Sequence, residues 1–172
     1  CMEGCNRREV DGSVNIRALE RWIADRIPVG RARAARAPNA KRFAIVGGGP
    51  AGLAAAYVLA RAGQAPTIFE GERALGGVLR TGIPTYRLAR EALDREIRDL
   101  LELGVEARFG EFLDSARVAA LAREYDGVIL ATGLQRLRGL DGPGADLRGV
   151  EQGIRFLHRL NLGGGVKLAG HI

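Results

Sequence analysis

A glycine-rich hexapeptide, GGGPAG at Gly47 to Gly52, is the feature that most constrains the fold of this 172-residue chain. It follows a short apolar run, Phe43 to Val46, and opens an alanine- and leucine-rich segment, Pro50 to Ala62, that predicts a helix. In the order strand, G-x-G-x-x-G, helix, the glycines serve a tight turn, a close approach of the backbone to a diphosphate, and close packing of helix on strand. The pattern therefore favours a nucleotide-binding turn.

The residues of this turn can be assigned separate mechanical roles. Gly47 would make the turn, Gly49 would let the backbone approach a diphosphate, and Gly52 would let the helix pack on the strand. The start of the helix would present unpaired N–H groups and a partial positive charge. The residues that we expect at the diphosphate are Gly47, Gly49, Pro50, Ala51 and Gly52. The alternative is a close glycine turn that binds nothing.

An acidic residue, Glu70, lies about 20 residues beyond the glycine turn, at the end of a second apolar run, Pro66 to Phe69. A carboxylate at this place can accept hydrogen bonds from a ribose diol, and it would repel a ribose 2′-phosphate. NADP is therefore disfavoured at this site. The alternative is that Glu70 is only a solvated strand end.

The remaining chain alternates between strand and helix patterns. Predicted helices cover 14–25, 90–103, 115–124 and 149–160, predicted strands cover 105–109 and 127–131, and 71–88 is a predicted loop. Alternation of this kind predicts an α/β fold with a mostly parallel sheet covered by helices.

Composition and charge narrow the class of protein. Hydrophobic residues make up 47% of the chain and charged residues 27%, as in globular domains. No apolar run approaches the roughly 20 residues of a membrane span, and the N-terminal stretch lacks the features of a signal peptide, so a cytoplasmic setting is expected. The net charge of +6 is spread along the chain without a nucleic-acid recognition motif. An acidic partner subunit or a cofactor diphosphate suits this charge better than nucleic acid.

Several motifs in a fixed order resemble the FAD domain of the glutamate synthase small-subunit family of iron-sulfur flavoprotein oxidoreductases, over nearly the whole chain. The matching motifs are GGGPAGL from Gly47, Phe69-Glu70, LGGVL at Leu75 to Leu79, GIPTYRL at Gly82 to Leu88, and ATG at Ala131 to Gly133. The resemblance implies a Rossmann-like FAD-binding domain with a parallel sheet, preceded by a remnant of a helical iron-sulfur domain.

The resemblance also implies where FAD would bind. The Gly47 to Gly52 loop would hold the diphosphate and Glu70 the adenosine ribose. Further cofactor contacts implied in this way are Gly77, Val78 and Arg87 along the flavin half, the backbone near Leu113 at the adenine, and Thr132 and Gly133 where the cofactor passes the end of a strand.

Two of these contacts have structural alternatives. Arg87 could instead form an ion pair with Glu91, which is four residues on in the next helix. The Ala131 to Gly133 segment could be an ordinary strand-to-loop glycine turn.

Two cysteines, Cys1 and Cys5, precede the first predicted helix. Alone they could be free thiols or a local disulfide, which a reducing cytoplasm disfavours, and two thiols cannot complete a metal site. The resemblance implies that Cys1, Cys5 and Glu20 are ligands of one [4Fe-4S] cluster, with the remaining ligand upstream of Cys1. For Glu20 the alternative is an exposed helix carboxylate.

The expected organisation has four parts. Residues 1–29 would end a helical [4Fe-4S] domain, 30–41 would be a linker, 42–136 the FAD-binding domain, and 137–172 a connector and helix leading to an NAD(P)H domain absent from this chain. Because the chain starts with Cys1 and stops within an apolar run, we expect it to be incomplete at both ends.

The expected function is electron transfer between NAD(P)H, FAD and [4Fe-4S] clusters, with an electron-transfer subunit or a ferredoxin-like protein as partner. One alternative is a noncatalytic FAD-containing relay or docking subunit of a larger complex. Another is an NAD-binding module without flavin.

Overall fold

The computed structural model describes residues 2–26, 36–134, 137–139 and 141–165. The chain forms two compact units, Cys1–Arg31 and Ala32–Ile172. The domain boundaries predicted from the sequence remain a prediction. Among the residues described, no helix has the length and apolar character needed to cross a membrane.

The first unit consists of a short 3-10 helix, η1 (Asn6–Glu9), and one amphipathic helix, α1 (Ile16–Arg26). The Asn15 side chain accepts the Ala18 N–H at 3.1 Å, which is why α1 begins two residues later than its apolar pattern predicts. The apolar face of α1 is exposed within this unit. Its residues are 43–54% exposed, and they are Ile16, Leu19, Trp22 and Ile23.

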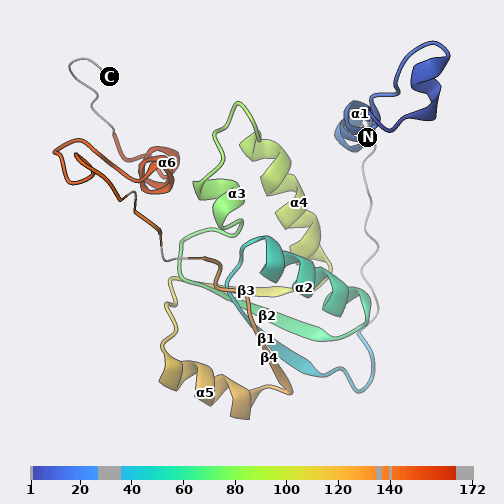
Figure 1. Ribbon diagram of the computed structural model, residues 1–172. Coiled ribbons are helices and arrows are strands. Elements are labelled where there is room, and N and C mark those ends of the chain that lie inside the picture. The colour runs from blue at the N-terminus through green and yellow to red at the C-terminus, as the bar shows by residue number, and fades with distance from the viewer. Residues whose placement is uncertain (1, 27–35, 135–136, 140, 166–172) are drawn as a thin grey trace. The chain divides into compact units, whose positions relative to one another are not determined.

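The second unit contains a four-stranded parallel sheet in the order β3-β2-β1-β4 (Figure 1). The strands are β1 (Arg42–Val46), β2 (Ala65–Glu70), β3 (Glu106–Phe109) and β4 (Gly127–Leu130). Phe43 of β1 pairs with Pro66 on one side and with Gly127 on the other. The predicted α/β fold with a parallel sheet is therefore confirmed, and every strand directs its carboxyl end to the same edge.

Helices follow the strands in the second unit. They are α2 (Pro50–Arg61), α3 (Val78–Thr81), α4 (Arg90–Glu102), α5 (Ser115–Glu124) and α6 (Gly153–Asn161). Gly63 and Gly104, with φ of 74° and 94°, provide the left-handed turns that end α2 and α4. The predicted loop at 71–88 contains one short helix, α3, which the sequence analysis did not predict. A single helical turn is too short to show an apolar period.

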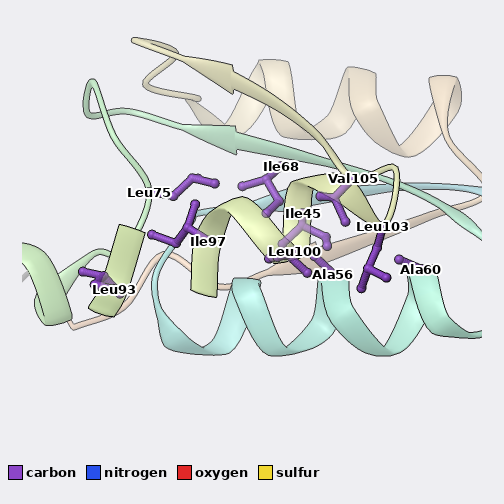
Figure 2. Packing of buried hydrophobic residues seen from close by; sticks show 10 residues of the cluster. All are labelled: Ile45, Ala56, Ala60, Ile68, Leu75, Leu93, Ile97, Leu100, Leu103 and Val105. Carbon is purple, nitrogen blue, oxygen red and sulfur yellow. The ribbon is translucent and has the colours of Figure 1, made fainter. Parts of the chain in front are cut away.

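Two hydrophobic clusters fix the sheet between its helices. On one face Ile45 and Ile68 pack with residues of α4 and with alanines of α2 (Figure 2). The full cluster consists of Ile45, Ala56, Ala60, Ile68, Leu75, Leu93, Ile97, Leu100, Leu103 and Val105. On the other face the intervening strand residues pack with α5; this cluster contains Ala44, Val46, Phe69, Leu121 and Tyr125. Because successive strand residues point to opposite faces, the two clusters together bury both faces of the central strands β1 and β2. The carboxyl ends of β1, β2 and β4 are thereby held in one fixed row.

Candidate functional site

In the turn between β1 and α2, backbone atoms of separate segments lie in close contact. Gly47 has φ of 105°, in the region that favours glycine. A Cβ on Gly47 would lie 2.4 Å from the Ala131 carbonyl oxygen, and a Cβ on Gly52 would lie 1.9 Å from the Gly47 carbonyl oxygen. Either side chain would displace backbone atoms. The first turn of α2 is therefore seated directly on the end of β1, beside the corner that follows β4.

The start of α2 is open to an incoming anion. Gly49 is the extended N-cap residue and provides no side-chain cap, and Pro50 occupies the first turn, where its missing N–H costs nothing. A Cβ on Gly49 would meet only the Gly77 Cα, at 3.9 Å. The first-turn N–H groups of a helix carry a partial positive charge. This geometry suits a diphosphate.

Glu70 ends β2 directly beside the glycine turn and is only 9% exposed. Its Oε2 accepts the Gly48 N–H at 2.7 Å, and its Oε1 accepts the Glu72 N–H at 2.9 Å. Each carboxylate oxygen has two lone pairs, so each can accept one further hydrogen bond. The two backbone donors fix the direction of the carboxylate at the edge of the sheet.

A second glycine pair lies against the first. The Gly76 N–H donates to the Gly48 carbonyl oxygen at 2.8 Å. Gly77 has φ of 49°, and a Cβ on it would lie 2.7 Å from the Gly49 Cα. The two glycine segments therefore approach each other without intervening side chains.

Arg80 fastens this second glycine segment to α4. Its Nε donates to the Leu75 carbonyl oxygen at 2.7 Å, and its guanidinium forms a salt bridge with Asp94. The Arg80 side chain is only 16% exposed. Val78, predicted to lie along a flavin, is the exposed first residue of α3.

The corner after β4 touches the glycine turn through backbone atoms. The Ala131 N–H donates to the Val46 carbonyl oxygen at 2.8 Å, which extends the pairing of β4 with β1. Thr132 and Gly133 follow as exposed residues, and Gly133 has φ of 73°. The structure thus brings the loops after β1, β2 and β4 together at one edge.

Arg87 and Leu113 lie outside this central group. Arg87 is exposed before α4, and among the described residues it forms no salt bridge with Glu91. Leu113 is partly buried and packs against the core cluster under α5. The neighbouring Phe112, which sequence reasoning missed, is 82% exposed.

Helix α6 contacts the loops after β2, which no local pattern predicted. The Asn161 side-chain N–H donates to the Thr81 carbonyl oxygen at 2.9 Å, and His158 Nε2 lies 3.2 Å from Glu72 Oε1. A Cβ on Gly82 would lie 2.8 Å from Ile154 Cδ1. These partners are about eighty residues apart in the chain, so only the folded structure reveals them.

In the first unit, Cys5 is a half-buried free thiol. Its Sγ accepts the Val14 N–H at 3.5 Å, and this and other backbone N–H groups lower the pKa of the Cys5 thiol. Glu20 is an exposed residue of α1, and Cys1 lies outside the described residues. In the described part of the chain, no three His, Cys, Asp or Glu residues are grouped so that they could hold a metal ion.

Comparison with known proteins gives consistent matches. The family model of the pyridine nucleotide-disulphide oxidoreductases matches residues 41–164. The NADP(+)-dependent formate dehydrogenase subunit beta of Moorella thermoacetica is 36% identical over 94% of this chain, and a glutamate synthase [NADPH] small chain of Mycobacterium tuberculosis is 39% identical over 80% of it. The chain spans 27% of the length of each of these two relatives.

A solved structure has the same fold. Mycobacterium tuberculosis FprA in complex with NADPH superposes with a TM-score of 0.62, over 73% of this chain and 30% of that one. The sequence identity is 23%, so this likeness concerns the fold alone.

The glycine contacts make a test of stability possible. Gly52→Ala places a Cβ 1.9 Å from a backbone oxygen, whereas Gly49→Ala places one in ordinary contact, 3.9 Å from the Gly77 Cα. We expect Gly52→Ala to lower the free energy of unfolding by about 1–3 kcal/mol through overpacking. Gly49→Ala should change it by less than about 1 kcal/mol, because a weaker N-cap and a less flexible unfolded chain offset each other. Urea unfolding followed by circular dichroism measures both. Equal stability of the two variants would contradict the close contact between Gly52 and the Gly47 carbonyl oxygen.

Proposed function

The chain belongs to the pyridine nucleotide-disulphide oxidoreductase family, and on this premise we propose that it is the FAD-binding portion of an NAD(P)H-dependent iron-sulfur oxidoreductase. The observation that carries the proposal is the edge where the two glycine segments meet. There the N-terminus of α2, which has no side-chain cap, lies beside the carboxylate of Glu70 and the corner after β4.

The diphosphate of FAD would lie at the start of α2, against Gly49, Pro50 and Ala51. The close contact between the Gly47 and Gly52 backbones, which leaves no room for side chains, fixes the start of α2 at the end of β1. Gly77 would bring the second glycine segment close to the flavin half of the cofactor, with Val78 beside it. Thr132 and Gly133 would line the passage at the end of β4, and we propose a surface contact for Arg87.

Glu70 supports FAD rather than NADP at this site. Each of its two oxygens already accepts one backbone N–H group, and each has a further lone pair that would accept a hydrogen bond from a ribose hydroxyl. A 2′-phosphate at the same place would bring like charges together in a position that is only 9% exposed. NAD(P)H would then bind in a separate domain outside this chain.

Bound FAD would supply the redox chemistry, accepting an electron pair from a nicotinamide and passing electrons on singly. The residues of this chain would bind the cofactor, orient it and keep its diphosphate at the helix terminus. We propose a cytoplasmic setting and an electron-transfer subunit or ferredoxin-like protein as the partner.

We propose in addition that Cys1, Cys5 and Glu20 are ligands of a [4Fe-4S] cluster, completed by a ligand upstream of Cys1. Cys5 fits this role, because N–H donors to its sulfur lower the thiol pKa and favour the thiolate that iron requires. A chain extended upstream of Cys1 is expected to bind iron and sulfide, and Cys5→Ser to lose them, with Ser13→Ala as the control. An extended chain free of iron would disprove this ligation.

Binding of FAD is tested by titration of the purified chain, with calorimetry and flavin absorbance as readouts. We expect Gly49→Ala to weaken FAD binding about tenfold or more, or about 1.4 kcal/mol, because its Cβ enters the space of the diphosphate. The matched control is Gly153→Ala at the start of α6, where a Cβ meets nothing within 4 Å. We expect it to leave affinity unchanged.

The same titration separates FAD from the alternative nucleotides. FAD should bind, and NADP should not compete for its site. If the wild-type chain takes up NAD but no FAD, the flavin assignment is wrong.

A further inference from the structure

The side chain of Phe112 stands outward from the segment that follows β3. It is 82% exposed, whereas Leu113 beside it packs into the core cluster under α5. Single exposed apolar residues are common on protein surfaces, so exposure alone indicates nothing. The position of this ring is the informative feature.

The ring lies directly on Gly71. A Cβ on Gly71 would be 2.6 Å from Phe112 Cε1 and 2.8 Å from Cδ1 and Cζ, so the ring occupies the space that any side chain at residue 71 would need. Two backbone hydrogen bonds hold the segment across the end of β2. The Glu111 N–H donates to the Glu70 carbonyl oxygen at 3.1 Å, and the Gly110 N–H donates to the Glu72 carbonyl oxygen at 3.3 Å.

Gly71 directly follows Glu70, which in the proposed function accepts hydrogen bonds from the ribose of the bound dinucleotide. The base is attached to that same ribose, so it must lie within one glycosidic bond of it. We propose that Phe112 stacks against the adenine of FAD, and that Gly71 is needed because it leaves room for the ring. This inference rests on the proposed function.

Stacking explains the residue type at this position. Every nucleobase has a π face, and alanine replacement of a stacked aromatic costs roughly 5- to 150-fold in affinity. Stacking depends on a flat aromatic surface rather than on a hydrogen-bonding group. Phe112→Trp should therefore preserve FAD affinity, whereas Phe112→Leu, which keeps apolar area without a ring, should not.

The first experiment compares FAD with FMN on the full chain. We expect Phe112→Ala to weaken FAD binding about fivefold or more. FMN has no adenine, so its affinity, whether measurable or absent, should be the same in wild type and variant. Val58→Ala, a 63% exposed apolar position on α2, is the control and should leave FAD affinity unchanged. Equal FAD affinity of Phe112→Ala and wild type, or an equal loss of FAD and FMN, would overturn the proposal.

The second experiment moves the ring without removing it. The φ of Gly71 lies outside the left-handed region, so its backbone accepts alanine, and the new Cβ would push the exposed ring aside. We expect Gly71→Ala to weaken FAD binding as Phe112→Ala does, and to add nothing in the Phe112→Ala background. Additive losses would show that Gly71 makes room for the ribose instead, which would overturn its assigned role.

The outcomes for the stacking role and for the FAD site are distinct. If the wild-type chain binds no FAD, the proposed function fails, and the stacking role fails with it. If the wild-type chain binds FAD and Phe112 can be replaced by alanine or leucine without loss, only the stacking role fails.

Discussion

The contact between the Gly47 carbonyl and Gly52 is the constraint on which the site depends. Helix α2 can approach the end of β1 so closely only because residue 52 lacks a Cβ, which would lie 1.9 Å from that oxygen. Gly47 also lies against the backbone of Ala131, in the corner after β4. One glycine turn therefore sets the position of α2 relative to β1 and to the corner after β4.

Electrostatics follow from this backbone geometry. The start of α2 provides partial positive charge without a basic side chain, and the carboxylate of Glu70 lies beneath the same turn, held by the Gly48 N–H at 2.7 Å. An anion is favoured in front of the helix and disfavoured beside the carboxylate. An extended dinucleotide satisfies both conditions, with its diphosphate at the helix and a neutral ribose diol at Glu70.

The fold was largely predictable from the sequence, because periodicity in β1, α2 and β2 and the glycine spacing agree with one another. The contacts around the site were less predictable from the sequence. Helix α3 is too short to show a period, and the approach of Gly77 to Gly49 depends on a loop conformation that no local pattern encodes. The hydrogen bond from Asn161 to Thr81 joins segments that only the tertiary fold brings together.

The signal for Phe112 was present in the sequence but could not be interpreted there. An aromatic residue after a strand is ordinary, and a glycine after an acidic residue is equally so. Their meaning depends on the pairing of β3 with β2, which places the two loops side by side. Sheet order, which periodicity leaves undetermined, therefore brings Gly71 and Phe112 together at the place where we propose that the adenine binds.

A crystal structure of this chain with FAD would test the central claim most directly. The account predicts diphosphate oxygens within about 2.7–3.2 Å of the first-turn N–H groups of α2, and the adenosine ribose at Glu70. A diphosphate bound elsewhere, with the start of α2 in contact only with solvent, would contradict it.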